Sequence, residues 1–344
     1  MTNLIAVNDC GLYCAAGDFY IDPWKPVPRA VITHAHSDHA RWGHGRYLTS
    51  VDGFTVLKSR MEPTATIDMV RYGESIAMHN SKISLHPAGH ILGSAQIRVE
   101  SEGEVWVVSG DYKTTADGTC QPFAPISCHT FISECTFGLP IYRWLEQTEV
   151  FDEINRWWRS NRDQKKASII FAYALGKSQR IIAGVDSSIG PIFCHGAVQN
   201  VNHDYRSSGV KLPETLYAGL GNSKGDWAGS LIVAPPSAIG TPWVRKFGDA
   251  STAYASGWMQ VRGTRRRRSV DRGFVLSDHA DWPGLLQAIE ATGAERVLLT
   301  HGRTGPMVRW LQESGRDANA LHTEYIGERD DIEIDSPDEA EAQS

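Results

Sequence analysis

The residues best suited to metal chemistry lie in one short stretch, Thr33-His34-Ala35-His36-Ser37-Asp38-His39. Imidazole and carboxylate groups bind divalent ions such as zinc without redox chemistry. Side chains two positions apart point to the same side of an extended segment, so His34 and His36 share one face. We expect the chain to turn at Asp38 and His39, so that these two residues can face a second ion. The pattern therefore favours half of a two-metal site over a histidine-rich surface loop.

A centre with two ions about 3.5–4 Å apart needs more ligands than this stretch supplies. Polar side chains at the ends of apolar strands are the next candidates, because functional residues concentrate in such loops. His90 lies in a glycine-flanked turn between two predicted strands, and Asp111 directly follows the apolar Val107-Val108. His301 directly follows Val297-Leu298-Leu299. Any one of these positions is commonplace, but together with the histidine stretch they predict a hydrolytic metal centre.

The predicted arrangement of the strands and helices that position these residues changes along the chain. Up to about residue 140 the sequence predicts short strands separated by glycine and aspartate turns, with occasional helices. From about 141 to 269 strands and helices alternate, which is typical of a parallel sheet. Residues 270–327 then return to the pattern that precedes residue 140. We therefore predict a layered α/β domain built from 1–140 and 270–327, with a second domain, 141–269, inserted into it.

Composition indicates a globular protein with an ample core, because 41% of the 344 residues are hydrophobic and 22% are charged. No stretch approaches the ~20 apolar residues of a membrane span, and the N-terminus lacks the pattern of a signal peptide. The six cysteines show no CxxC spacing. They predict the reduced thiols of a cytoplasmic protein, and the lack of an apolar span predicts no membrane partner.

Charge is distributed unevenly. The net charge is −6, but residues 328–344 hold eight acids and one base, so the remaining body carries +1. We predict that this acidic tail is disordered. Within the body lies a basic run, Arg265-Arg266-Arg267-Arg268, which can bind phosphates locally and so leaves a nucleic-acid partner open.

These segments resemble the metallo-β-lactamase superfamily, and more narrowly its β-CASP nucleases. The HxHxDH stretch is the superfamily's most specific motif, and the similarity runs from about residue 11 to 305. The other matching residues are Asp22 after Phe19-Tyr20-Ile21, His90 in AGHILGSAQ, Asp111 in SGDY, Glu134 in SECTFG, His279 in LSDHAD and His301 in LLTHG. The resemblance implies a four-layer αββα fold with an inserted parallel-sheet domain. The segment SGWMQVRGTRRRRSVDRGFVLSDHADW looks most similar to bacterial exonucleases associated with a DNA ligase.

The resemblance also implies a role for each residue. One ion, expected to be zinc or else manganese, would bind His34, His36 and His90, and the other Asp38, His39 and His301, with Asp111 bridging them. A hydroxide held between the ions would attack phosphorus. Asp38, His279 and Glu134 would be catalytic: His279 would protonate the leaving oxygen, and Glu134 would hold His279. Asp22 would have a supporting role, because it would fix the tautomer of a ligand histidine.

Two of these roles have simpler alternatives. Asp22 could instead cap the turn before Pro23, and Glu134 could have only a structural role. Lys177, Ser178 and Arg180 could contact substrate phosphates, although Phe171 stands where a phosphate-binding loop needs glycine. We predict that the Arg265–Arg268 run binds the phosphates of the nucleic-acid backbone.

The function that we predict is a two-metal phosphodiesterase, an exonuclease acting on DNA in repair, with a DNA ligase or helicase system as a possible partner. An RNA-processing nuclease is the main alternative, because in β-CASP enzymes a histidine at the position of His301 is typical of RNA-cleaving members. A lactonase or thioesterase on the same metal core is the third. Such hydrolases lack an inserted domain with a nearby arginine run.

Overall fold

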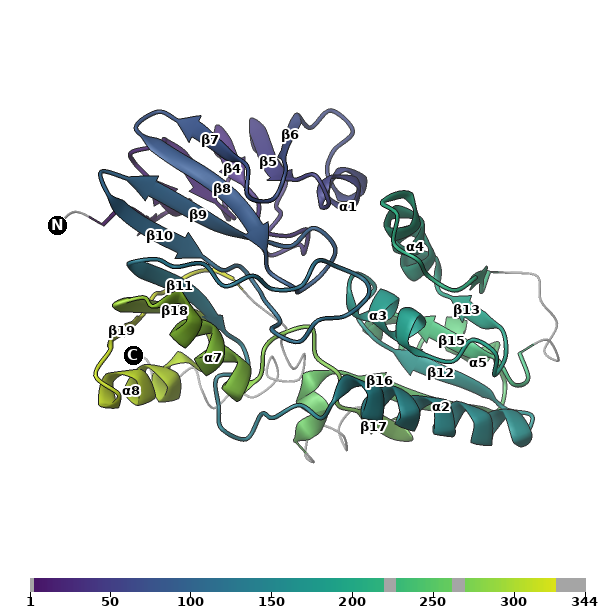
Figure 1. Ribbon diagram of the computed structural model, residues 1–344. Coiled ribbons are helices and arrows are strands. Elements are labelled where there is room, and N and C mark those ends of the chain that lie inside the picture. The colour runs from purple at the N-terminus through teal and green to yellow at the C-terminus, as the bar shows by residue number, and fades with distance from the viewer. Residues whose placement is uncertain (1–2, 220–226, 262–269, 326–344) are drawn as a thin grey trace, which may run out of the picture.

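The computed structural model describes residues 3–219, 227–261 and 270–325, and contains three β-sheets with helices packed against them (Figure 1). The mixed α/β fold predicted from the sequence is confirmed. The first sheet has six strands in the order of the sequence. They are β1 (Ala6–Asn8), β2 (Gly11–Cys14), β3 (Phe19–Ile21), β4 (Arg29–Val31), β5 (Arg46–Ser50) and β6 (Ile67–Val70), and helix α1 (Phe54–Arg60) joins the last two.

The second sheet has seven strands in the order β19-β18-β11-β10-β9-β8-β7. Their bounds are β7 (Ser75–Met78), β8 (Ser81–Pro87), β9 (Ala95–Ser101), β10 (Glu104–Val108), β11 (Thr130–Cys135), β18 (Arg296–Gly302) and β19 (Asp317–Ala320). Strand β11 pairs in parallel with β10 on one side and with β18 on the other. Two segments far apart in the sequence are thus neighbours in one sheet.

These two sheets face each other across a shared hydrophobic core. Its buried side chains come from both, among them Leu12, Ile21, Val31, Leu85, Ile97 and Ile132. Helices α7 (Trp282–Thr292) and α8 (Thr304–Glu313) pack on the other face of the second sheet, where Leu285 and Ile289 contact the cluster that contains Phe131 and Val297. On the first sheet, α1 contributes Val56 and Leu57 to a cluster with Ala30 and Tyr47.

The third sheet is wholly parallel, as the alternation of strands and helices predicts. Its order is β14-β13-β15-β12-β16-β17. The strands are β12 (Ala167–Phe171), β13 (Ile192–Cys194), β14 (Leu216–Tyr217), β15 (Leu231–Ala234), β16 (Ala250–Ala255) and β17 (Arg272–Phe274). The helices are α2 (Gln147–Asp163), α3 (Lys177–Gly184), α4 (Gly196–Ser207) and α5 (Pro242–Arg245), with short 3-10 turns at Pro236–Ala238 and Gly257–Gln260.

Some predictions fall on residues that the structure does not describe. The Arg265–Arg268 run, the predicted domain boundary at residue 269 and the acidic tail, 328–344, all lie outside the described residues. The division of the chain into an outer and an inserted domain stays a prediction. Within the described ranges, no helix is long and apolar enough to cross a membrane.

The turn after β8 must pass very close to the segment before α1. Gly93 has φ +79°, and a Cβ added there would lie 1.9 Å from the Cα of Gly53. Gly103 has a similar φ of +86°, but a Cβ there would meet nothing within 4 Å. The two positions therefore carry similar backbone strain, and they differ in the steric clash.

We expect Gly93→Ala to lower the free energy of unfolding by about 3 kcal/mol or more, because clash adds to left-handed strain. Gly103→Ala should cost only the strain, about 1 kcal/mol. Thermal or urea unfolding of both variants measures the difference. Equal losses at the two positions would contradict the close packing of this turn.

Candidate metal and catalytic site

The candidate ligands lie in loops and strand ends at one edge of the two facing sheets. The histidine stretch follows β4 and turns at His36, whose carbonyl accepts hydrogen bonds from the backbone of His39 and Ala40 at 3.1 and 2.8 Å. His90 lies between β8 and β9, and Asp111 follows β10. The carboxyl ends of parallel strands share an edge, so Glu134 near the end of β11 also lies beside this group.

The pairing of β11 and β18 is irregular at the site. Ser133 pairs with Leu299 and Cys135 pairs with Gly302, so Thr300 and His301 together oppose Glu134. Bulges of this kind redirect side chains and are common next to active sites. Here the bulge turns Glu134 and His301 toward the same group of residues.

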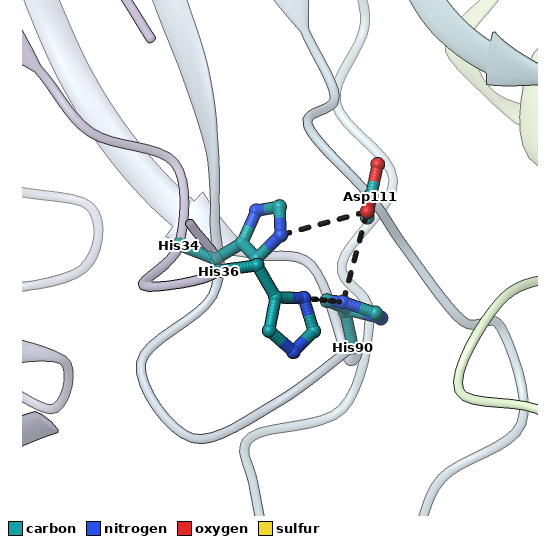
Figure 2. Close-up of side chains that lie close together, drawn as sticks. All are labelled: His34, His36, His90 and Asp111. Carbon is teal, nitrogen blue, oxygen red and sulfur yellow. Dashed lines mark hydrogen bonds and ion pairs between the residues drawn. The ribbon is translucent and has the colours of Figure 1, made fainter. Parts of the chain in front are cut away.

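Four residues form the first ligand group: His34, His36, His90 and Asp111, with one candidate ligand atom each and all of these atoms within 4.8 Å of one another. Figure 2 shows the side chains of His34 and His36, which share one stretch, converging with those of His90 and Asp111 from other segments. Oδ2 of Asp111 lies 3.5 Å from Nε2 of His34 and 3.8 Å from Nε2 of His90.

The hydrogen bonds of His36 and His90 indicate that a cation belongs between them. Nε2 of His36 lies 3.2 Å from the carbonyl of Leu175, and Nδ1 of His90 lies 2.8 Å from the carbonyl of Asp278. Carbonyl oxygens only accept hydrogen bonds, so each neutral ring uses its one N–H there. The remaining nitrogens, 3.1 Å apart, then both present lone pairs. A shared divalent ion resolves this contact.

The second ligand group uses the other oxygen of the same carboxylate. Oδ1 of Asp111 lies 2.9 Å from Nε2 of His301 and 3.5 Å from Nε2 of His39. Asp38 extends the group, with Oδ2 3.7 Å from Nε2 of His39. Among the described residues, Nε2 of His34 and Nε2 of His39 are buried without any hydrogen-bond partner. Buried polar atoms are normally satisfied, so these two nitrogens fit metal ligands.

Asp22 supports this arrangement from behind. It has φ +43°, and it accepts hydrogen bonds from the backbone N and hydroxyl of Thr33. Its Oδ2 also lies 2.8 Å from Nδ1 of His39. Nδ1 of His39 therefore carries the proton, and Nε2 faces the ligand group. These contacts fit the supporting role that we predicted better than a cap of the following turn.

The electrostatics of the site follow from burial and mutual charge. Burial lowers the pKa of His34 and of His90 well below the usual value, so both rings are neutral and able to ligate. Burial alone would raise the pKa of Asp111, but the charges of His39, His279 and His301 hold it well below its ordinary range. Burial opposes charge on His39, yet the carboxylates of Asp111, Asp38 and Asp22 raise its pKa to about 10. A metal must therefore displace a proton from His39 when it binds.

His279 and Glu134 form a buried pair beside the ligand groups. Nδ1 of His279 lies 2.9 and 2.8 Å from the two oxygens of Glu134. Oε1 of Glu134 also accepts a hydrogen bond from the backbone N of Tyr112 at 2.7 Å, which fixes the carboxylate. Nε2 of His279 then points toward Oδ2 of Asp111, at 4.0 Å. This geometry suits an acid that transfers a proton next to the metal centre.

The structure does not bring Lys177, Ser178 and Arg180 to an open surface. All three are buried at the start of α3. Nζ of Lys177 lies 3.8 Å from Asp278, while Arg180 contacts Asp278 at 3.2 Å and Gln147 at 2.7 Å. The hydroxyl of Ser178 donates to the carbonyl of Tyr173. These contacts join α3 to the His279 loop, and a contact with substrate phosphates stays a prediction.

Sequence reasoning missed one residue that contacts the second ligand group, Tyr325. Tyr325 is buried and stacks on the ring of His39, with centroids 4.6 Å apart and an interplanar angle of 14°. Its edge also faces His301 at 5.8 Å, and its hydroxyl donates to the carbonyl of Ile21 at 3.2 Å. Nothing in its spacing marks it, because it lies well beyond the last motif. The carbonyls of Leu175 and Asp278 were missed because backbone acceptors leave no sequence signal.

No family model matches the chain, but curated proteins and solved structures resemble it. A "Probable DNA ligase" of Opitutus terrae is 29% identical over 326 residues, which are 94% of this chain and 31% of that protein. An "RNase J-like protein" of Methanocaldococcus jannaschii is 23% identical over 235 residues, covering 58% of this chain and 54% of that one. The chain thus spans a third to a half of these relatives.

A crystal structure of a protein of unknown function from Enterococcus faecalis has the same fold, with a TM-score of 0.57. The two are 12% identical, and the match covers 80% of this chain and 76% of that one. The relatives are similar to this chain in sequence. In the structure of this chain, the candidate ligand residues lie close together at one centre. These relatives support the resemblance of the chain to the β-CASP nucleases of the metallo-β-lactamase superfamily.

Proposed function

We propose that the protein is a two-metal-ion nuclease that hydrolyses phosphodiester bonds in DNA, acting as an exonuclease. One observation carries the two-metal proposal: the two oxygens of Asp111 face two separate histidine groups. A carboxylate shared in this way is the usual bridge between paired catalytic ions. The ligase-named relative, which matches almost the whole chain, supports DNA as substrate and a ligase-linked repair system as partner.

The chain's own residues would divide the work around two divalent ions, most simply zinc. His34, His36 and His90 would hold one ion, Asp38, His39 and His301 the other, and Asp111 both. The ions would supply an activated water and positive charge against the phosphate. His279, held by Glu134, would donate its Nε2 proton to the leaving oxygen.

The finer features of the fold belong to the same proposal. A four-layer αββα arrangement is supported by helical clusters on the outer faces of the two facing sheets. A cytoplasmic location is supported by the six cysteines, which are all free.

RNA is a second candidate substrate, and one observation favours it. His301 is present and contacts Asp111 at 2.9 Å, and the RNase J-like relative bears a ribonuclease name. Matched single- and double-stranded DNA and RNA, labelled at either end and incubated with zinc or manganese, separate the two. We expect stepwise shortening of DNA. Faster cleavage of RNA would reject the DNA proposal, and internal cuts would reject exonuclease action.

We expect His36→Ala and Asp111→Ala each to abolish cleavage, because each removes a ligand that no neighbour replaces. Bound metal, measured by mass spectrometry of the metal content, should fall to about one ion or fewer per chain. His203→Ala is the matched control, since His203 is exposed on α4. Normal cleavage by both ligand variants would show that the assigned metal site is wrong.

The His279–Glu134 pair gives a separate prediction. His279→Ala should lower kcat by about 10²–10⁴-fold, the usual contribution of a general acid, while metal content stays unchanged. Glu134→Gln keeps an acceptor for Nδ1 but loses the charge that favours the protonated imidazole, so it should lower kcat less and shift the alkaline limb of the pH–rate profile to lower pH. An unchanged profile in Glu134→Gln would leave Glu134 a purely structural role.

A further inference from the structure

A groove with both polar and apolar walls lies beside the histidine stretch. It has a volume of about 560 Å³, and its walls include Ser37, Arg41, Trp42, Ser59 and Arg60. Small-ligand sites typically measure ~300–1,000 Å³. Ser37 stands between His36 and Asp38 in the sequence, so the groove shares a wall with the metal centre.

Trp42 gives this groove a fixed aromatic face. Its side chain is 62% exposed, which is unusual for a residue with so much apolar surface. Its position is nevertheless held, because Nε1 donates a hydrogen bond to the carbonyl of Arg60 at 2.8 Å. An exposed indole fixed by its own N–H is a platform on which a flat ring can stack at little entropic cost.

The guanidinium groups of Arg41 and Arg60 line the same groove as Trp42, and each has N–H donors without a hydrogen-bond partner among the described residues. Within the described part of the chain, the guanidinium of Arg60 makes no hydrogen bond or ion pair, and the charge of Asp38 acts on it electrostatically. Nη1 of Arg41 donates to the carbonyl of Trp24 at 3.4 Å, while its Nε is buried without a partner. Arginine donors that the protein leaves unused suit a phosphate group.

One residue of the groove wall, Ser59, contacts helix α4. The hydroxyl of Ser59 donates to Oδ2 of Asp204 on α4 at 2.6 Å, which joins α1 to α4. In Figure 1, α1 and α4 lie opposite each other. Asp204 adds a negative charge at that end, so a phosphate is favoured at Arg41 and Arg60 and not beside Ser59.

We propose that this groove binds one nucleotide of the substrate next to the scissile bond, with its base stacked on Trp42 and its phosphate on Arg60 and Arg41. The proposal rests on the proposed nuclease function, because it deepens the description of the same substrate. Stacking on an aromatic side chain accepts every base, so the groove would add affinity without adding sequence preference.

The test measures binding and cleavage in parallel on the metal-loaded protein. Fluorescence anisotropy with a labelled, hydrolysis-resistant phosphorothioate oligonucleotide gives Kd, and the natural oligonucleotide gives KM and kcat. Trp42→Ala should weaken binding by about tenfold, the size of one base–aromatic stack, with kcat nearly unchanged. Trp42→Phe should recover most of the affinity. Trp310→Ala is the matched control, because Trp310 is 48% exposed on α8 and should be neutral.

A series of oligonucleotides, each lacking one base, tests stacking directly. In the wild-type protein one position should show about a tenfold penalty, and in Trp42→Ala that position alone should lose its penalty. Arg60→Gln should make the plot of log binding constant against log salt concentration less steep by the amount expected for about one phosphate contact. Arg309→Gln on α8 should leave this slope unchanged. Identical profiles in wild type and Trp42→Ala would overturn the groove proposal.

The outcomes separate this proposal from the proposed function. If the wild-type protein cleaves normally but Trp42→Ala binds like wild type, the groove is wrong and the nuclease stands. If no oligonucleotide is cleaved but the binding penalty for one missing base depends on Trp42, the groove proposal stands and the nuclease proposal is wrong. If the wild-type protein neither binds nor cleaves any oligonucleotide, both are overturned.

Discussion

The structure depends above all on one buried carboxylate, that of Asp111. Its side chain is 3% exposed, and removing a carboxylate from water costs several kcal/mol unless charges or hydrogen bonds compensate. Here the compensation comes from imidazoles on every side, contributed by His34, His39, His90, His279 and His301. The loops that carry these rings belong to both facing sheets. Ligation and packing of the two sheets are therefore parts of one equilibrium, and bound ions should stabilise the fold as well as serve the reaction.

The strand arrangement explains why these residues meet. Parallel strands deliver their carboxyl ends to one edge, and β10, β11 and β18 are parallel neighbours. The irregular pairing at Glu134 then orients the Glu134–His279 pair and His301 toward the same point. Helix α3 adds a further constraint, because Lys177 and Arg180 bind the carboxylate of Asp278 and hold its pKa at about 2. Burial alone would have raised that pKa. The same residue accepts the N–H of His90 through its carbonyl, so α3 indirectly orients a candidate ligand.

The sequence predicted the parts of the site that depend on side-chain type and spacing. The turn at Asp38 and His39, the strand-end positions of Asp111 and His301 and the alternation of the third sheet all have clear local patterns. Contacts made by backbone carbonyls could not be predicted, because Leu175 and Asp278 act through atoms that every residue has. Lys177 and Arg180 are predicted phosphate ligands, and the structure places both in a buried ion-pair network with Asp278. The same charges serve a buried ion-pair network equally well, and only burial and partners tell the two uses apart. Tyr325 was missed because stacking has no spacing rule over such a distance.

The parallel pairing of β11 with β18 also has a consequence for how the protein is made. Strand β11 leaves the ribosome early, while its neighbour β18 is synthesised only after the whole third-sheet region. A growing chain can therefore display His34, His36, His39, His90 and Asp111 but not His301, and the face of His39 stays uncovered until Tyr325 arrives. The order of translation thus leaves the second ligand group incomplete until the chain has been synthesised beyond His301.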